Sequence, residues 1–276
     1  MVPKTLTIAG SDSGGGADIQ DERKTFAALE TYGSSVITEI PARNTLGVVA
    51  VHEIPTEMIA AQLDTVLGDI GAGAAKTGML SAAAIIATVA AGVRRHGLAR
   101  LVVDPVMVAK SGDRLLREDA VDALRSELLP LALVVTLNIP EAKTLAGIPI
   151  RWDDDRPEAA RRIAAFGTRW VVIKGGHAEG DPVDVPYEAE SGCVTPIAAG
   201  PRIDTPNTHG TGCTFAAAVT AGLARGQGIE EAVRGAKAFV TAALRASYPV
   251  GAGHSPVHHF HAWWLPTPTR VTISGR

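Results

Sequence analysis

The sequence predicts an α/β fold in which a doubly wound, largely parallel sheet is flanked by helices. Short apolar runs alternate with longer segments of helical periodicity through most of the 276 residues, which is the pattern of βα units. The chain has no internal repeat, no low-complexity run and no linker long enough to separate two domains. We therefore expect a single domain over residues 1–264. The remaining residues, 265–276, are rich in Pro and Thr without apolar periodicity and are expected to form a loose tail.

The strands are expected where apolar and β-branched residues form short runs bounded by turn-forming residues. These runs are Thr5–Ala9, Ser35–Ile40, Ala74–Thr77, Leu101–Asp104, Leu133–Thr136 and Trp170–Lys174. The helices are expected where apolar residues recur at helical spacing. These segments are Ile19–Tyr32, Glu57–Leu67, Ala82–His96, Glu118–Leu129, Pro140–Leu145, Pro157–Phe166, Thr214–Gly226 and Ile229–Ser247. Pro186–Ile203 combines Gly, Pro and β-forming residues and is expected to form a meander or hairpin.

The composition indicates a soluble cytoplasmic protein and gives no reason to expect nucleic acid or membrane as a partner. The net charge is -3 and aromatic residues make up only 4% of the chain, so neither a basic surface nor base-stacking platforms are expected. No segment approaches the ~18 uninterrupted apolar residues of a membrane span, and the first residues do not resemble a signal peptide. Two cysteines, Cys193 and Cys213, are too few for a disulfide framework.

The most informative segment is Thr208–Cys213, which runs directly into the small-residue helix expected from Thr214. Gly210 and Gly212 allow a tight turn at a helix start, where unpaired N–H groups and the helix dipole favour an anion. The positive helix end is also expected to lower the pKa of Cys213. An anion site beside a candidate base suits phosphoryl transfer to a hydroxyl. The alternative is a closely packed helix start with a core cysteine.

Five further segments follow predicted strands at the edge where such sheets bind ligands. They are Gly10–Gly16, Lys76–Leu80, Asp104–Val106, Asn138–Glu141 and Lys174–His177. Each alone could be an ordinary turn, but their common position favours a binding site.

These segments predict a kinase that differs in design from the common nucleotide-binding folds. No Walker A motif is present, and no GxGxxG follows the first strand, which disfavours a nicotinamide enzyme. Lys174 can contact nucleotide phosphates, and Asp104 with Glu141 can hold Mg²⁺ or its waters.

Several of these motifs, in this order, resemble hydroxymethylpyrimidine/phosphomethylpyrimidine kinase of the ribokinase-like superfamily. The segments that carry the resemblance are Ile8–Ala17, Lys76–Leu80, Asp104–Gly112, Lys174–His177, Asn207–Thr214 and Gly253–Trp264. The resemblance implies a three-layer αβα fold, a homodimer, and ATP and Mg²⁺ as cofactors. It also implies phosphorylation of 4-amino-5-hydroxymethyl-2-methylpyrimidine and then of its monophosphate, in thiamine biosynthesis.

The resemblance implies a role for each matching position. The amides of the turn formed by Gly210, Thr211 and Gly212 would stabilise the transferring phosphoryl group, and Cys213 would take the hydroxyl proton. The implied ATP-binding residues are Lys174, Asn138, Thr208 and Glu141. The resemblance also implies that Asn138 with Glu141 orients Mg²⁺ and its waters, and Asp104 with Glu141 remain the candidate metal residues from the reasoning on the residues above. The implied substrate-binding residues are Gly10, Ala17, Met79 and Val106, together with two positions that depart from the family, Glu22 and Arg43.

The departures lie in two segments of the expected substrate pocket. Where the family reads Gly-Ile-Gln-Ala-Asp-Leu-Lys, this chain has Asp18–Lys24, so that Glu22 replaces a substrate-facing aspartate. Arg43 replaces a glutamine that offers the aminopyrimidine edge one donor and one acceptor, whereas arginine offers donors only. Arg43 could pair with Glu22, select an anionic or acceptor-rich ligand, or point to solvent.

Two other functions remain as alternatives. A branch of the family phosphorylates pyridoxal, and a protein that keeps the fold without turnover could bind a pyrimidine. The four histidines between His254 and His261 are expected to belong to a docked C-terminal segment rather than to a metal site.

Overall fold

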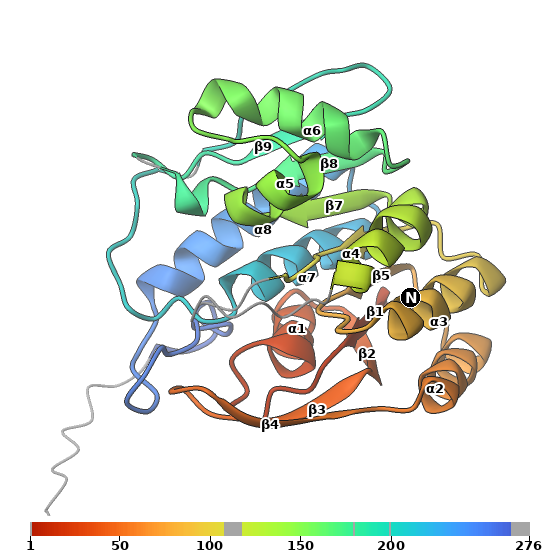
Figure 1. Ribbon diagram of the computed structural model, residues 1–276. Coiled ribbons are helices and arrows are strands. Elements are labelled where there is room, and N and C mark those ends of the chain that lie inside the picture. Colours follow the sequence, from red (N-terminus) through yellow and green to blue (C-terminus); the bar gives the residue numbers. More distant parts are fainter. Residues whose placement is uncertain (1, 108–117, 179, 199, 266–276) are drawn as a thin grey trace, which may run out of the picture.

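The computed structural model describes residues 2–107, 118–178, 180–198 and 200–265, and it confirms the predicted α/β sheet (Figure 1). The described residues form a seven-stranded sheet in the order β2-β1-β5-β6-β7-β8-β9, in which only β9 runs antiparallel to its neighbour. Its strands are β1 (Lys4–Ala9), β2 (Tyr32–Ile37), β5 (Ala74–Thr77), β6 (Leu101–Val103), β7 (Val134–Leu137), β8 (Trp170–Ile173) and β9 (Val185–Glu188).

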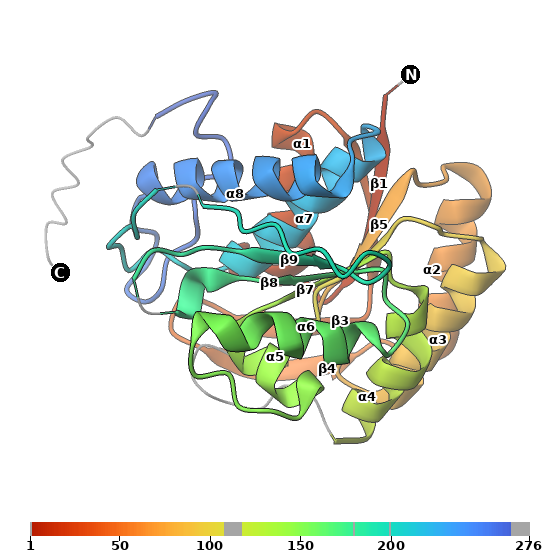
Figure 2. The same ribbon diagram turned by 90° about the horizontal axis from the view of Figure 1, so that it is seen from above.

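Helices cover both faces of this sheet, which makes three layers (Figure 2). The helices on one face are α1 (Asp18–Ala28), α7 (Thr211–Ala224) and α8 (Ile229–Arg245). Those on the other face are α2 (Thr56–Asp69), α3 (Ala83–Arg95), α4 (Glu118–Ala123), α5 (Ile139–Ala146) and α6 (Arg156–Ala164).

The burial of the strands and of α7 follows from their composition. Strands β5, β6 and β7 are buried along their whole length, as expected for parallel strands that are covered on both faces. Helix α7 is apolar on all sides, and every residue from Cys213 to Leu223 is buried between the sheet, α1 and α8. This packing fixes the start of α7 at the carboxyl edge of the sheet.

The expected strand Ser35–Ile40 is wrong in its extent. The chain forms β2 and then a separate antiparallel hairpin of β3 (Glu39–Arg43) and β4 (Val48–Glu53), of which β4 was not predicted. Every residue of β4 is exposed, so this strand is stabilised by pairing with β3 rather than by a buried face.

The expected helix Ile19–Tyr32 is also too long. It ends at Ala28 because the chain reverses through Glu30, whose φ is 59°, and Tyr32 already belongs to β2. The expected helix Glu118–Leu129 changes character after Ala123, with a π-helical turn at Leu124–Leu128 and a 3₁₀ turn at Leu129–Leu131. Pro130 accounts for the end of this segment, because proline lacks the N–H that a continuing helix needs.

The hairpin expected within Pro186–Ile203 is present in part. β9 begins one residue earlier and pairs with β8, while Tyr187 and Asp184 bridge to Val194 and Ile197. Two other predictions lie outside the described residues, namely the Val108–Gly112 part of the motif that follows Asp104 and all but the first residue of the tail at 265–276. Within the described ranges, no helix is both long and apolar enough to cross a membrane.

Candidate active site

The candidate site lies at the carboxyl edge of the parallel strands, where the predicted segments meet the start of α7. A methyl group built on Gly212 would lie 3.6 Å from Lys174 Nζ and 3.8 Å from Asp104 Oδ2. Lys174 follows β8 and Asp104 follows β6, so three segments that are far apart in sequence converge at this point. The convergence is the expected consequence of parallel strands that end at one edge.

The anion turn, residues Thr208–Cys213, has the geometry that its two glycines predict. Gly210 has a φ of 77°, and a Cβ atom there would overlap the carbonyl oxygen of Gly16. Helix α7 begins at Thr211, three residues before the predicted start, and no side chain caps it. The N–H groups of Thr211, Gly212 and Cys213 donate to no backbone acceptor among the described residues, which leaves them available to an anion.

Asp12 organises the glycine loop that follows β1. Its carboxylate accepts hydrogen bonds from the backbone N–H groups of Gly14, Gly16 and Ala17, at 2.8, 3.1 and 2.9 Å. It also lies 3.1 Å from His209 Nε2 in the anion turn. Burial raises the pKa of Asp12, but His209, the charge of Arg43 and the Gly14 N–H together hold it at about 2.

Four buried charged side chains near the anion turn, on segments from α1 to the end of β8, form consecutive ion pairs. Glu22 pairs with Lys76, Lys76 Nζ lies 3.8 Å from Asp104 Oδ2, and Asp104 Oδ1 lies 3.0 Å from Lys174 Nζ. Burial raises the pKa of Asp104, but Lys174 and Lys76 outweigh it, so this pKa is lowered. Burial lowers the pKa of Lys174, but Asp104 and Glu141 raise it above its usual value. Asp104 and Lys174 are therefore both charged at neutral pH.

Asn138 and Glu141 form a reciprocal capping box at the start of α5. Asn138 Oδ1 accepts from the Glu141 N–H at 2.8 Å, and Glu141 Oε2 accepts from the Asn138 N–H at 2.8 Å. Burial raises the pKa of Glu141 to about 7, against the opposing charge of Lys174. One oxygen of each side chain is thus used by the helix cap, and the backbone N–H of Met107 also donates to the Glu141 carboxylate.

The expectation that the helix end lowers the pKa of Cys213 is wrong. Cys213 is buried, and burial raises the pKa of its thiol well above the usual value, although the charge of Lys76 opposes this shift. The desolvation of a thiolate in this position outweighs the helix dipole. Cys213 is therefore a thiol in the unliganded protein.

The two departures from the family do not pair with each other. The Glu22 carboxylate has no exposed surface and is bonded to Lys76 and Thr7, so the suggested Arg43–Glu22 pair is not formed. Arg43 is half-buried at the end of β3, and its backbone is tied to Ser13 in the glycine loop.

The four other predicted pocket residues lie on the loops around this point. Gly10 and Ala17 are buried at the two ends of the glycine loop, and Met79 and Val106 are half-buried after β5 and β6.

Asp18, at the start of α1, is a buried charged residue that was not expected from the sequence. It is only 6% exposed, its φ is 53°, and no described residue forms a hydrogen bond or ion pair with its carboxylate. Burial, followed by the charge of Glu22, raises its pKa to about 7. The signal available in the sequence was the replacement of the family's glycine by aspartate at this position.

The C-terminal segment docks on the anion turn, as expected. His259 Nε2 lies 2.6 Å from Asp21 Oδ1, which also accepts from Thr214 Oγ1 at 2.8 Å. The His209 N–H donates to the Ser255 carbonyl at 3.1 Å. These hydrogen bonds attach the C-terminal segment to the first turn of α7 and to the anion turn.

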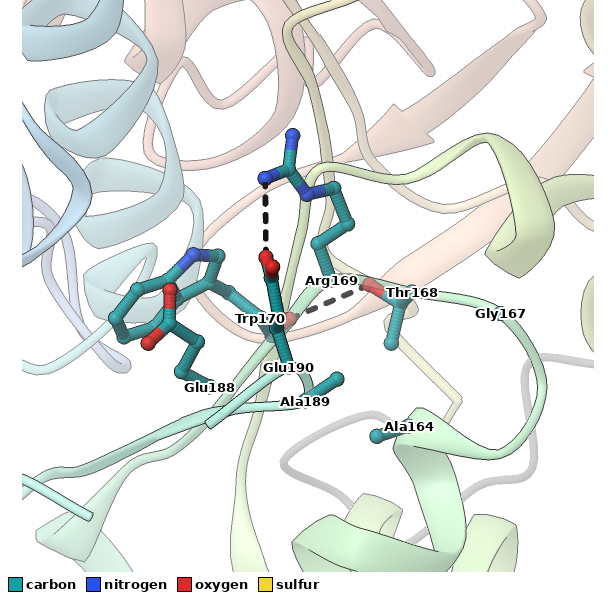
Figure 3. A pocket seen from close by; sticks show the side chains of 8 residues that line it. All are labelled: Ala164, Gly167, Thr168, Arg169, Trp170, Glu188, Ala189 and Glu190. Atoms are coloured by element: carbon teal, nitrogen blue, oxygen red, sulfur yellow. Dashed lines mark hydrogen bonds and ion pairs between the residues drawn. The ribbon is translucent and has the colours of Figure 1, made fainter. Parts of the chain in front are cut away.

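A hollow of about 380 Å³ lies at the opposite edge of the sheet, where β8 begins (Figure 3). Its rim includes Arg169 and Glu190, whose ion pair measures 4.0 Å and is largely exposed. Thr168 Oγ1 donates to the Trp170 carbonyl at 3.3 Å. None of the predicted site residues lines this hollow, so we do not assign it to the candidate site.

Comparison with known sequences yields matches over almost the whole chain. A family model described as phosphomethylpyrimidine kinase matches residues 12–258. A hydroxymethylpyrimidine/phosphomethylpyrimidine kinase of Rhizobium meliloti is 50% identical over 268 residues, which cover 96% of this chain and 99% of the relative. A protein of the same name from Bacillus subtilis is 45% identical over 259 residues, which cover 93% and 94% of the two chains.

Comparison with solved structures yields kinases of the same architecture. The ADP complex of Bacillus subtilis pyridoxal kinase has a TM-score of 0.88 at 42% identity and covers 95% of this chain and 99% of that one. The phosphomethylpyrimidine kinase of Clostridium difficile has a TM-score of 0.79 at 40% identity, with coverages of 88% and 100%. The ribokinase-like fold implied by the sequence motifs is thereby confirmed.

Proposed function

The chain belongs to the phosphomethylpyrimidine kinase family, and we propose that the uncapped start of α7 is the place where it transfers the phosphoryl group. The protein is an ATP-dependent kinase of 4-amino-5-hydroxymethyl-2-methylpyrimidine and of its monophosphate, in thiamine biosynthesis. The observation that supports this location is the convergence of Gly212, Lys174 and Asp104 at the carboxyl edge of the sheet.

In this proposal the anion turn stabilises the charge that develops on the transferring phosphoryl group. The first-turn N–H groups contributed by Thr211, Gly212 and Cys213 point out of the helix start, and the helix dipole adds to their effect. Lys174 contacts the nucleotide phosphates, because its ammonium group lies beside Gly212 and is held in place by Asp104. Thr208 and Asn138 complete the nucleotide site.

We propose that Mg²⁺ binds together with the nucleotide. Among the described residues, no three His, Cys, Asp or Glu side chains gather as a ready-made cation site. Asp104 Oδ2 is buried and accepts no hydrogen bond, and Glu141 keeps one oxygen outside its helix cap. Two carboxylates are enough for a Mg²⁺ ion that keeps several of its waters and is also bound by the phosphate oxygens of the nucleotide. The ion would neutralise part of the negative charge of those phosphates.

Cys213 is proposed to accept the proton of the substrate hydroxyl. In the unliganded protein its pKa is raised by burial, so the thiol must first release its proton to solvent water, and the resulting thiolate then accepts the proton of the hydroxyl. Lys76 and Lys174 are the neighbouring cations, and both interact with Cys213 electrostatically. They would stabilise the thiolate once nucleotide and alcohol exclude water.

We also propose that the protein is a cytoplasmic homodimer. The reaction requires ATP, which the cytoplasm supplies. The β3–β4 hairpin and its turn expose large apolar side chains, among them Leu46 (74%) and Val49 (85%), as a dimer interface would require. Sedimentation of the wild type and of Val49→Asp tests the dimer.

The experiment that tests the function measures ADP release from Mg-ATP with three alcohols in parallel. The alcohols are the hydroxymethylpyrimidine, its monophosphate and pyridoxal, which is included because pyridoxal kinase is among the structural neighbours. Turnover of either pyrimidine by the wild type supports the proposal. Turnover of pyridoxal alone would replace it by the pyridoxal kinase alternative. Turnover of a pyrimidine only after Arg43→Gln would mean that the natural alcohol is a different one.

A further inference from the structure

Asp21 on α1 is a buried carboxylate that was not selected from the sequence as a site residue. It stands where the family motif has alanine, so the carboxylate is a feature of this chain. Its side chain has no exposed surface, and its Oδ2 has no hydrogen-bond partner among the described residues. A buried carboxylate that is only partly satisfied disfavours folding. The contacts of its other oxygen, Oδ1, indicate what the carboxylate does in this place.

Asp21 Oδ1 connects the start of α7 to the C-terminal segment. It accepts a hydrogen bond from Thr214 Oγ1 at 2.8 Å, and it lies 2.6 Å from His259 Nε2. A Cβ built on Gly210 would lie 2.7 Å from the same oxygen, so Asp21 also packs against the anion turn. The Thr214 N–H donates to the Gly210 carbonyl at 2.8 Å and thereby closes the first turn of α7. Asp21 therefore contacts both ends of the turn that contributes the anion-binding N–H groups.

The C-terminal segment packs against the other side of the anion turn. His209 and Pro256 form a parallel β-bridge, in which the His209 N–H donates to the Ser255 carbonyl at 3.1 Å. A Cβ on Gly16 would lie 2.5 Å from the His209 ring and 3.2 Å from Pro256 Cβ, which leaves no room for a methyl group there. The anion turn is thus enclosed by α1, the glycine loop and the C-terminal segment, and the contacts of Asp21 tie the first of these to the last.

The direction of the N–H groups in the anion turn decides how well they act. Such donors stabilise charge that develops in the transition state, and a hydrogen bond weakens steeply as its angle departs from linearity. A displacement of about 1 Å can lower a rate by about 10²-fold. Helix α7 has no side-chain cap of its own to fix its first turn. The hydrogen bonds of Asp21 supply a restraint from outside the helix.

We propose that Asp21 and His259 are positioning residues of phosphoryl transfer, which hold the first turn of α7 so that its N–H groups point at the transferring group. This assignment rests on the proposed function of the anion turn. It accounts for a buried carboxylate at a position where the family motif has alanine. Because neither residue is assigned a contact with a substrate, their loss should lower kcat and leave KM for the alcohol unchanged.

The test begins with Asp21→Ala, which introduces the residue of the family motif. Thr214 Oγ1 and His259 Nε2 lie 3.5 Å apart and can then bond to each other, so this variant is expected to fold. Its kcat should fall by about 10- to 100-fold, whereas KM for the hydroxymethylpyrimidine should change by less than about threefold. Tm should change by less than about 4 °C.

Conservative variants separate positioning by hydrogen bonds from a general loss of structure. Asp21→Asn keeps an acceptor oxygen, and His259→Gln keeps a donor nitrogen at a similar reach, so each should retain kcat within about threefold of the wild type. The matched control is His254→Gln, which changes an exposed histidine of the same segment and should behave as the wild type.

Amide hydrogen exchange tests the restraint without any turnover. The Thr214 N–H should exchange about tenfold faster in Asp21→Ala and at the wild-type rate in Asp21→Asn, as expected for the loss of one hydrogen bond. Unchanged exchange in Asp21→Ala would overturn the proposal, and so would a kcat within about threefold of the wild type. A loss of kcat in Asp21→Asn as large as in Asp21→Ala would also overturn it. The proposed function fails separately, if the wild type phosphorylates neither pyrimidine.

Discussion

Asp12 Oδ2 lies 3.1 Å from His209 Nε2, and this contact joins the glycine loop after β1 to the anion turn at the start of α7. The two segments also touch through their backbones, because a Cβ on Gly210 would overlap the Gly16 carbonyl. The loop that is proposed to hold the alcohol and the turn that is proposed to hold the phosphoryl group are therefore one rigid unit. Pre-organisation of this kind keeps the reacting groups within range of one another.

Replacement of Asp12 by Asn should destabilise the protein at neutral pH. The pKa of Asp12 is about 2 in the folded protein and 3.8 in a model compound, so the folded state binds fewer protons between these values. The stabilisation is present above pH 4 and is lost as the pH falls toward 2. We expect Asp12→Asn to lower the free energy of unfolding by about 1–3 kcal/mol at pH 7. Urea denaturation at pH 7, 4 and 2.5 measures this difference.

The difference between Asp12→Asn and the wild type should shrink as the pH is lowered. The exposed variant Asp69→Asn serves as the control for a simple change of net charge. A difference that stays constant between pH 7 and 2.5 would mean that the negative charge of Asp12 is not what stabilises the loop.

Removal of the Cys213 thiol should affect turnover far more than binding. We expect Cys213→Ala to lower kcat by about 10²- to 10⁴-fold, with little change in KM for either substrate, because a proton acceptor acts in the transition state. Cys193 is exposed and is not among the candidate site residues, so Cys193→Ala should behave as the wild type.

The raised pKa of Cys213 can be tested independently by the reactivity of its thiol. Iodoacetamide at pH 7.5 should label Cys193 and leave Cys213 unmodified in the unliganded protein, as detected by mass spectrometry. Rapid labelling of Cys213 would contradict its burial as a thiol in the unliganded protein, and near-normal kcat in Cys213→Ala would contradict its assignment as the group whose thiolate accepts the proton.

The position of Lys174 depends on a buried ion pair further from the site. Asp184 Oδ1 accepts from the Gly175 N–H at 2.8 Å and from Lys237 Nζ at 2.9 Å. Asp184→Ala would leave Lys237 buried without this partner, so we expect a loss of about 3–5 kcal/mol in the free energy of unfolding. The turn that follows β8 would also loosen and KM for ATP should rise. Thermal unfolding and steady-state kinetics measure the two effects.

A double variant separates the charge from the hydrogen bond in this pair. Asp184→Leu combined with Lys237→Met removes both charges and should be less destabilised than the sum of the two single variants. Strict additivity would show that Asp184 acts only through the Gly175 N–H.

The sheet and the convergence of the site segments could be predicted from the sequence because parallel strands and their carboxyl ends obey simple periodic rules. Two features could not be predicted from the sequence. The β3–β4 hairpin has no buried face on β4, so no hydrophobic alternation marks it. The state of Cys213 depends on burial by segments far away in the sequence, whereas the sequence shows only the adjacent helix start. Local patterns therefore predicted the placement of the site better than its electrostatics.

The last prediction concerns the effect of Asp18 on stability. Its pKa is about 7 in the folded protein against 3.8 in a model compound, so the folded state binds more protons between these values. The wild type therefore loses stability as the pH rises from about 4 to above 7. Asp18→Gly removes the buried carboxylate and the unfavourable φ together. We expect a gain of about 1 kcal/mol at pH 4 from the backbone, rising to on the order of 2–4 kcal/mol at pH 8.

Glu30 provides the matched control, because it also has a positive φ, of 59°, but lies exposed. Glu30→Gly should give a backbone gain that does not depend on pH, since no buried charge is removed. Urea denaturation of the three proteins at pH 4, 6 and 8 measures both effects. A pH-independent gain in Asp18→Gly would show that the Asp18 carboxylate is solvated in the folded protein. A gain that grows with pH would show that keeping this carboxylate charged in its buried position lowers the free energy of unfolding of the wild type.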